Sequence, residues 1–308
     1  MYAIETLGLT KQFGNVAAVD DLCLKVPEGS IYGFLGRNGS GKTTTFKMLT
    51  GLISPTSGEI KFYDSTVNHK DLKTRYDFGY LPDVPGFYGW MNAQEFLRFS
   101  GELFSIPKSS LDDRIEMLLA LVGLEGVNKR ISGYSRGMKQ RLGIAQALIH
   151  DPKIVFLDEP VSALDPIGRK DVMDIIAKLS EKVTVLFSTH ILSDVERICD
   201  RIAVIDNGKI QLEDSIVNIR RNYGVQALEI DLASGDISEL RALLDKVEWV
   251  KNTSVADNGT LKVYVTDMEK AQVNLPGIIA EKRMALKKFS VAEGTLEEAF
   301  MKAVSADE

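Results

Sequence analysis

The chain has 308 residues, a length that suggests about two domains. Apolar residues make up 44% of it and charged residues 26%, as in an ordinary soluble globular protein, and the net charge of -6 argues against a generally basic, nucleic-acid-binding surface. The two cysteines fit neither a zinc site nor a disulfide framework, and no apolar run reaches the roughly 18 residues that span a bilayer, so we expect a cytosolic protein whose role at a membrane is at most peripheral.

The N-terminal segment, residues 1–30, is predicted to form antiparallel strands joined by turns that contain glycine. Phe13, followed by Val19, is a candidate platform on which an adenine ring could stack. The alternative is that Phe13 is only a half-buried aromatic residue of a turn.

A phosphate-binding loop follows the next apolar strand, residues 30–35. Loop 36–44 reads G-x-x-x-x-G-K-T-T and consists of Gly36, Arg37, Asn38, Gly39, Ser40, Gly41, Lys42, Thr43 and Thr44. Glycines let backbone N–H groups close around phosphate oxygens, and the helix after the loop offers the positive end of its dipole. Lys42 can reach the β- and γ-phosphates, and the Thr43 hydroxyl can bind Mg²⁺. The agreement of strand, loop and helix disfavours a chance glycine-rich turn and predicts binding of a nucleoside triphosphate.

The sequence pattern in the middle of the chain predicts a helical insert in an α/β core. Residues 91–149 carry helical periodicity, with helices predicted over 93–103, 111–122 and 138–149. Apolar strands then alternate with helices from residue 154 to residue 205, which predicts parallel pairing. The pattern changes near residue 222. We therefore predict one domain over 1–221, with its helical insert at about 86–150, and a small α+β domain over 222–308.

Polar residues follow two buried strands of this core. Asp158 and Glu159 come after the strand at 154–157, and His190 comes after the strand at 183–187. The carboxyl ends of parallel strands are where α/β folds bind ligands, so Asp158 is placed to hold Mg²⁺ and Glu159 to polarise a water that attacks the γ-phosphate. His190 could bond to the γ-phosphate and to that water. The alternatives are a solvated acidic pair and a structural histidine.

One further segment indicates the family. Tyr134-Ser135-Arg136-Gly137-Met138-Lys139-Gln140-Arg141 precedes the Asp158 strand at the spacing of an L-S-G-G-Q-x-Q-R signature motif. With the phosphate loop and the acidic strand end, it makes residues 1–215 resemble the nucleotide-binding subunit of ATP-binding-cassette (ABC) transporters. The resemblance places Phe13 at the aromatic A-loop position, loop 36–44 at Walker A, Asp83 at the Q-loop position, residues 154–159 at Walker B, residues 162–165 at the D-loop and His190 at the switch histidine.

This resemblance implies a fold and an assembly. The fold is an α/β P-loop NTPase core of the ABC type, with a RecA-like lobe, an antiparallel β subdomain and an inserted helical subdomain, followed here by the α+β module. Ser135 before a helix-forming run is also a good N-cap whose neighbouring N–H groups could bind an anion, although an ordinary capped helix would look the same. In the family this helix end faces ATP on the opposite subunit. Ser135, Arg136, Gly137, Met138 and Asp165 are thus expected to contribute to nucleotide binding in a dimer.

The chain departs from the family pattern at three positions. Asp83 stands in place of a glutamine, with a shorter and anionic side chain that could still bind Mg²⁺ beside Thr43 and Asp158, directly or through water. Arg136 and Met138 replace a glycine and a glutamine of the signature. These departures and the trailing segment 294–300 resemble the exporter branch that includes antibiotic-resistance and multidrug-efflux ATPases.

The expected function is that of an ATP-hydrolysing, Mg²⁺-dependent subunit that pairs with a second cassette and drives a separate membrane permease at the cytoplasmic face of the membrane. Residues 82–90, including Tyr88 and Trp90, are expected to border the groove for the permease, unless these aromatic residues belong to the helical core. The alternative function is a soluble ABC ATPase acting on ribosomes or DNA. Its zinc modules, second cassette and coiled-coil arm are not visible. A regulatory module without turnover is disfavoured by Glu159 and His190.

Overall fold

The computed structural model describes residues 1–68, 74, 76–180, 182–223, 227–256 and 259–292. The chain divides into two compact units, Met1–Ile216 and Val217–Glu308, and each has its own hydrophobic core. The predicted domain boundary after residue 221 lies within helix α7 (Ile216–Tyr223), which begins where the first unit ends. The trailing segment 294–300 lies outside the described residues.

A six-stranded sheet forms the centre of the first unit. Its strands, in spatial order, are β11 (Lys209–Ser215), β10 (Arg201–Asp206), β4 (Ile31–Leu35), β9 (Thr184–Thr189), β8 (Ile154–Leu157) and β7 (Phe78–Leu81). All neighbours from β10 to β7 pair in parallel, and β11 pairs antiparallel with β10 at the edge. Strands β4, β8 and β9 are buried along their whole length, which is why they read as continuous apolar runs.

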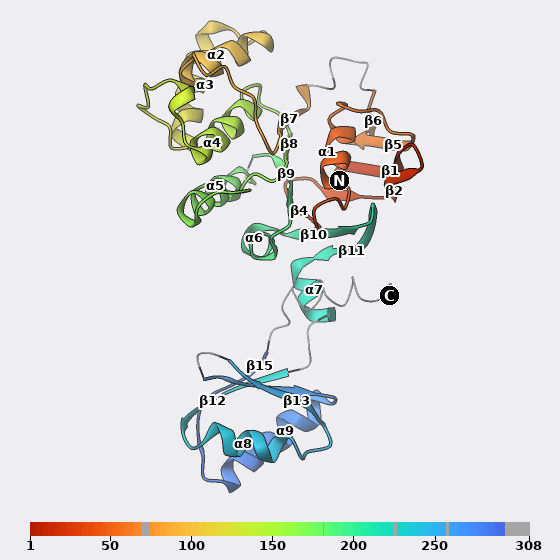
Figure 1. Cartoon of the computed structure of the whole chain (residues 1–308), viewed down its shortest axis with the longest axis vertical. Coiled ribbons are helices and arrows are strands. Elements are labelled where there is room, and N and C mark those ends of the chain that lie inside the picture. Colours follow the sequence, from red (N-terminus) through yellow and green to blue (C-terminus); the bar gives the residue numbers. More distant parts are fainter. Residues whose placement is uncertain (69–73, 75, 181, 224–226, 257–258, 293–308) are drawn as a thin grey trace. The chain divides into compact units, whose positions relative to one another are not determined.

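Both faces of this sheet are covered (Figure 1). Helices α5 (Pro166–Leu179) and α6 (Leu192–Ile198) lie on one face, and helix α1 (Lys42–Leu49) lies on the other together with an antiparallel sheet. The strands of the antiparallel sheet are β2 (Val16–Leu22), β1 (Tyr2–Phe13), β5 (Ser57–Phe62) and β6 (Ser65–Thr66), with β3 (Lys25–Pro27) also paired to β1. The first strands of the chain are therefore antiparallel, as predicted.

An aromatic cluster anchors α1 between the two sheets. The ring of Phe46 on α1 lies 6.2 Å from that of Phe34 on β4 and 6.0 Å from that of Phe156 on β8, measured between centroids. Phe156 in turn contacts Phe62 of β5 and Phe78 of β7. Burial of each such side chain stabilises the fold by about 1.5–3 kcal/mol. The start of α1, where the phosphate loop ends, is thereby fixed relative to β8.

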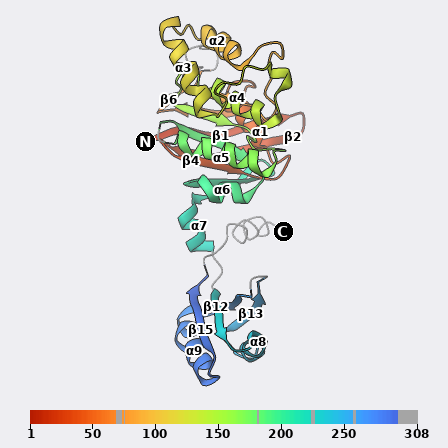
Figure 2. The ribbon, with the colours of Figure 1, turned by 90° about the vertical axis from the view of Figure 1, so that its left-hand side faces the viewer.

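The helical insert contains α2 (Ala93–Leu103), α3 (Lys108–Leu121), the 3₁₀ turn η2 (Ile131–Gly133) and α4 (Arg136–Ala147). Figure 2 shows these helices grouped together, and α2, α3 and α4 contact one another. Helix α4 also packs on β7, where a Cβ added to Gly79 would lie 1.9 Å from the carbonyl oxygen of Ala147. This close approach joins the insert to the edge of the parallel sheet.

The second unit is a separate α+β sandwich. Its elements follow the order β12 (Ala227–Ser234), α8 (Ile237–Leu244), β13 (Val250–Val255), β14 (Leu261–Val265), α9 (Met268–Glu281) and β15 (Ala285–Val291). The antiparallel sheet has the order β13-β14-β12-β15, and its core includes buried residues of both helices.

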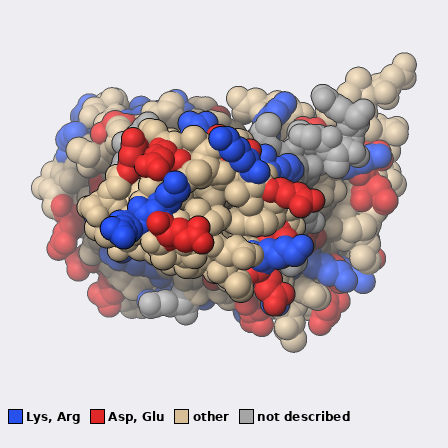
Figure 3. Space-filling view, turned by 90° about the horizontal axis from the view of Figure 1, so that it is seen from below, with Lys and Arg blue, Asp and Glu red and all other residues tan. Residues whose placement is uncertain are grey.

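On the face shown in Figure 3, acidic and basic side chains are interspersed. Within the described ranges, no helix has both the length and the apolar character needed to cross a membrane.

Candidate nucleotide-binding site

Loop 36–44 follows β4 and leads into α1, and two of its glycines are required by close contacts. A Cβ on Gly36 would lie 2.5 Å from the carbonyl oxygen of Ile205. Gly41 has φ of 110°, in the left-handed region, and a Cβ there would lie 2.6 Å from the carbonyl oxygen of Ala18. The backbone can therefore curl tightly at the start of α1, an arrangement that suits an anion.

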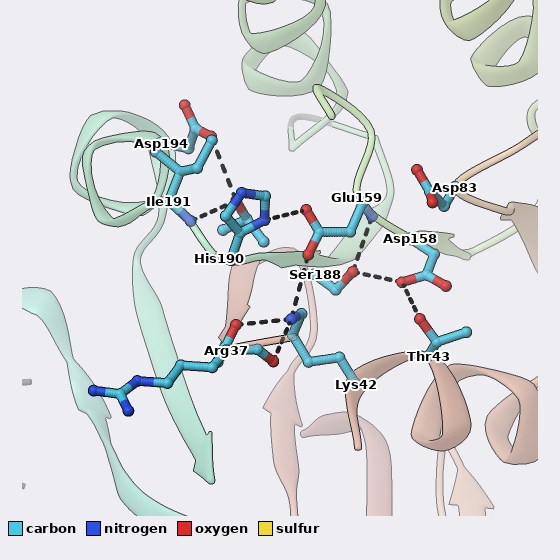
Figure 4. Close-up of polar contacts among 12 residues, drawn as sticks. Arg37, Lys42, Thr43, Asp83, Asp158, Glu159, Ser188, His190, Ile191 and Asp194 are labelled. Atoms are coloured by element: carbon cyan, nitrogen blue, oxygen red, sulfur yellow. Dashed lines mark hydrogen bonds and ion pairs between the residues drawn. The ribbon is translucent and has the colours of Figure 1, made fainter. Parts of the chain in front are cut away.

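Lys42 turns back under this loop (Figure 4). Its side chain is only 5% exposed, and Nζ donates to the carbonyl oxygens of Gly36 at 2.7 Å and Arg37 at 3.1 Å. Oε1 of Glu159 lies 3.3 Å from the same nitrogen. The ammonium group is thus held inside the loop by acceptors that a phosphate oxygen could replace.

Asp158 lies directly after β8, beside the start of α1. Its Oδ1 accepts a hydrogen bond from the hydroxyl of Ser188 at 2.6 Å and a longer one from the hydroxyl of Thr43 at 3.4 Å. Burial is the main cause that raises the pKa of Asp158 above its usual value, and the hydroxyls of Ser188 and Thr43 oppose it. A desolvated carboxylate next to a hydroxyl is a suitable pair of ligands for a hard cation such as Mg²⁺.

Glu159 connects the loop to His190. Its Oε2 lies 2.9 Å from Nδ1 of His190, and its backbone N–H donates to Oγ of Ser188 at 2.9 Å. The φ angle of Glu159 is 49°, which non-glycine residues seldom adopt and which is often found at functional sites. Lys42, Glu159 and His190, predicted separately from the sequence, therefore form one connected group at the carboxyl ends of β8 and β9.

Further residues that were not predicted bond to the residues on either side of His190. The N–H of Ile191 donates to Oγ1 of Thr189 at 3.0 Å, and that hydroxyl donates to Oδ2 of Asp194 at 3.4 Å. Arg169 donates from Nε to Oδ1 of Asp194 at 2.7 Å. Ser188 and Thr189 are polar residues that follow an apolar run in β9, and this pattern could have marked them as candidates from the sequence. No local pattern marks Arg169, which comes from α5.

Asp83 lies near this group after β7 (Figure 4). Its negative charge is one of the smaller causes that raise the pKa of Asp158. Its Oδ1 lies 3.6 Å from Nη2 of Arg136, the first residue of α4. Among the described residues, no hydrogen bond joins Asp83 to Thr43 or Asp158.

The two residues predicted to stack on adenine differ in exposure. Phe13 is 54% exposed at the end of β1, with Nζ of Lys11 5.3 Å from the centre of its ring. Val19 has no exposed surface and packs beneath the phosphate loop, where its Cγ2 would lie 3.3 Å from a Cβ on Gly41. Val19 therefore shapes the loop from below and offers no surface to a base, because the core of the unit covers it.

The signature residues lie apart from the loop. Oγ of Ser135 accepts the N–H of Met138 at 3.2 Å and caps α4, as predicted. Asp165 occupies the N-cap position of α5 without a side-chain cap. In the part of the chain that the structure describes, no hydrogen bond or ion pair joins Ser135, Arg136, Gly137, Met138 or Asp165 to loop 36–44. A single chain thus brings together the loop, the acidic pair and His190, but not the signature.

The residues present fit a magnesium nucleotide. Oγ of Ser40, in loop 36–44, is buried without a hydrogen-bond partner among the described residues, as expected of a group that meets a ligand. Across the described ranges, no group of three or more His, Cys, Asp or Glu could hold a metal. A cation at Thr43 and Asp158 would therefore need phosphate or water oxygens to complete its coordination, which is the usual manner of Mg²⁺.

Comparison with known proteins identifies the family. The family model described as ABC transporter matches residues 19–162. The uncharacterized ABC transporter ATP-binding protein YxlF of Bacillus subtilis is 39% identical over 307 residues, which cover 99% of this chain and 100% of that protein. The bacitracin transport ATP-binding protein BcrA of Bacillus licheniformis is 37% identical, over 98% of this chain and 97% of its own length.

Solved structures agree with the sequence relatives. A dimeric bacterial ABC transporter cassette, MJ0796, superposes with a TM-score of 0.63 at 26% identity, over 69% of this chain and 98% of that one. The predicted fold class is therefore confirmed. Since the similarity to the sequence relatives extends over almost the whole length, the chain belongs to the family of ABC transporter ATP-binding proteins and is an ABC-type ATPase.

Proposed function

We propose that the chain hydrolyses ATP with Mg²⁺ at this site and drives export through a separate membrane permease, which would hold it at the cytoplasmic face of the membrane. The observation that carries the proposal is the contact of Glu159 with both Lys42 and His190, next to Asp158 and Thr43. Export is supported by the similarity to a bacitracin transport ATP-binding protein.

Each side chain then has a task. The Glu159 carboxylate accepts a proton from the water that attacks the γ-phosphate, and His190 keeps that carboxylate oriented through the contact at Nδ1. Lys42 exchanges its carbonyl partners for phosphate oxygens. Mg²⁺, which Thr43 and Asp158 would hold, supplies neutralising charge. Phe13 is exposed enough to meet the adenine ring.

The proposed active form is a pair of chains. Among the residues that the structure describes, no hydrogen bond or ion pair joins Ser135, Arg136, Gly137 or Met138 at the N-terminus of α4 to the loop of its own chain. In the pair, this helix end would face the phosphates bound to the other chain, with Asp165 nearby. A dimeric solved cassette of the same fold supports such pairing. The pair would consist of two copies of this chain or of this chain and a related cassette.

The substitution Glu159→Gln tests the ATP-binding part of this proposal. It should abolish turnover, because the amide cannot accept the proton of the attacking water, while MgATP binding remains. Light scattering should then detect a dimer with MgATP and a monomer without it. Lys42→Ala, which removes the phosphate-binding ammonium, is the matched control and should neither bind nucleotide nor dimerise. A Glu159→Gln chain that stays monomeric with saturating MgATP would contradict the pairing.

A groove on the first unit suits the permease. It has a volume of about 720 Å³, and its lining includes the aromatic residues Phe87, Tyr88, Phe96, Phe99 and Phe104. Tyr88, which we expected at this border, lines the groove and is 49% exposed. Trp90 is 66% exposed and contacts Tyr88 with ring centroids 6.0 Å apart. The apolar face of a short helix from a membrane protein would fit such a lining.

Leu103→Glu tests this docking site. Leu103 lines the groove and is 69% exposed, so a charge there should weaken permease binding without disturbing the fold. We expect the chain to be lost from the membrane fraction of cells that also express its permease, with ATP binding in solution unchanged. Met117→Glu on α3, 49% exposed and outside the groove lining, is the control. Equal membrane recovery of both variants would exclude this groove.

A further inference from the structure

Two departures from the family pattern, Asp83 and Arg136, contact each other. Nη2 of Arg136 lies 3.6 Å from Oδ1 of Asp83, and the two side chains are 48% and 44% exposed. A half-exposed ion pair of this kind shifts an equilibrium by roughly two- to fivefold at most. A contact of that strength can give way to another partner when a ligand binds.

The backbone at Asp83 is held independently of its carboxylate. Gln140, one helical turn after Arg136 and 1% exposed, donates from Nε2 to the carbonyl oxygen of Asp83 at 3.0 Å. One turn further, a Cβ on Gly143 would lie 2.4 Å from Cδ1 of Leu81. Successive turns of one face of α4 thus contact the end of β7 and the segment that follows it. The carboxylate can change its partner while its backbone stays fixed.

Asp83 also interacts electrostatically with a second carboxylate, that of Asp158. Its charge acts on Asp158, so the two carboxylates repel each other. In the nucleotide-free chain, Asp83 is paired with Arg136. A divalent cation at Thr43 and Asp158 would remove the repulsion between the two carboxylates and would attract Asp83 in place of Arg136.

The position of Arg136 in the helix also favours a change of partner. It stands at the N-terminus of α4, where the helix dipole disfavours a cation and favours an anion. Without Asp83, its charge would have no ion pair among the described residues and would lie beside Ser135 at the helix start, where the first N–H groups have no partner within the helix. A phosphate is the group that satisfies both the guanidinium and those N–H groups.

We infer that Asp83 and Arg136 form an exchangeable ion pair, which ties the start of α4 to the segment after β7 in the nucleotide-free chain and opens when ATP joins two chains. Asp83 then turns to the cation of its own site, and Arg136 turns to the phosphate bound by the partner chain. This inference rests on the proposed ATP-driven pairing.

A double-mutant cycle with Asp83→Asn, Arg136→Gln and both changes together tests the exchange. The readout is amide hydrogen exchange at residues 139–142, the first N–H groups that bond within α4. Without nucleotide, each single change should accelerate exchange roughly two- to fivefold, and the double change no more than either. With MgATP in a Glu159→Gln background, the coupling between the two positions should disappear.

Lys139→Gln is the matched control, since Lys139 is a cation of the same helical turn with no ion pair among the residues that the structure describes. It should leave the coupling between positions 83 and 136 unchanged. Additive effects in the nucleotide-free chain would show that the two residues do not act as a pair. Equal coupling with and without MgATP would show a permanent ion pair. Either result would overturn the inference.

Failure of the proposed pairing is distinguishable. In that case the Glu159→Gln chain remains a monomer with MgATP by light scattering. The coupling can still be measured in that nucleotide-bound monomer. Its loss there would support the turn of Asp83 to the cation, whereas its persistence would overturn the exchange.

Discussion

Ser188 bonds to both acidic residues at the end of β8. Its Oγ accepts the N–H of Glu159 at 2.9 Å and donates to Oδ1 of Asp158 at 2.6 Å, and its side chain has no exposed surface. Glu159 needs this support because its left-handed φ is unfavourable for a residue with a side chain. A single hydroxyl therefore orients the carboxylate of Asp158 and holds the backbone of Glu159.

Ser188→Ala should affect both stability and activity. The loss of the hydroxyl leaves a buried N–H and a buried carboxylate short of a partner, which should lower the free energy of unfolding by about 1–3 kcal/mol. Loss of the orienting bonds should reduce ATP turnover by about 10–100-fold, measured as phosphate release at saturating MgATP.

Thr184→Val is the matched control on the same strand. Oγ1 of Thr184 accepts the N–H of Gly29 at 3.0 Å at the other end of β9, far along the strand from Ser188. It should cost a similar free energy of unfolding and leave turnover unchanged. If both variants lost the same activity, Ser188 would act only through stability.

At the scale of elements, α5 and α6 are joined near their first turns. Arg169 of α5 contacts Asp194 of α6, whose side chain is 5% exposed, with Nη2 and Oδ1 2.6 Å apart. These helices follow Asp165 and His190 respectively. The ion pair therefore connects the helix after Asp165, expected at the interface of two chains, with the helix after His190, which contacts Glu159.

Arg169→Ala should disrupt this connection. Removal of one partner leaves the buried carboxylate of Asp194 uncompensated, so the free energy of unfolding should fall by about 3 kcal/mol. The turnover number should also fall, with less change in the KM for ATP, because Lys42 and loop 36–44 remain intact. Steady-state kinetics and urea unfolding measure the two effects.

Arg197→Ala provides the comparison between the same helices. Arg197 of α6 pairs with Asp174 of α5 at 2.6 Å, but the side chains are 41% and 48% exposed. It should cost less than about 1 kcal/mol and leave turnover unchanged. Equal kinetic effects from both substitutions would mean that the spacing of the helices matters and the buried pair does not.

The elements that position the site were largely predictable, and their mutual contacts were not. The apolar runs before loop 36–44 and before Asp158 are local signals of buried parallel strands. Helix α3 begins at Lys108, earlier than the predicted start at Leu111, because its first turn is polar and apolar periodicity does not register it. The Arg169–Asp194 pair depends on two helices meeting in space, for which the sequence carries no local pattern.

For the whole molecule, the division into two units has a thermodynamic consequence. Every residue placed in the candidate site belongs to Met1–Ile216, whereas Val217–Glu308 has a separate core under its own sheet. A ligand stabilises only the structure that binds it, by RT ln(1 + [L]/Kd). The fluorescence of the two tryptophans can report on the unfolding of each unit separately, because Trp90 lies in the first unit and Trp249 packs against the core of the second.

MgATP should therefore shift the unfolding of only one unit. In a Glu159→Gln background, Trp249→Phe leaves Trp90 as the fluorescent probe of the first unit, and Trp90→Phe leaves Trp249 as the probe of the second. At about 100 times Kd, nucleotide binding alone should stabilise the transition seen by Trp90 by about 2.7 kcal/mol, pairing of two chains would add to this, and the transition seen by Trp249 should stay in place. Lys42→Ala should remove the shift. A common shift of both probes would mean that the units unfold together, and the second would then be an integral part of the ATP-binding body.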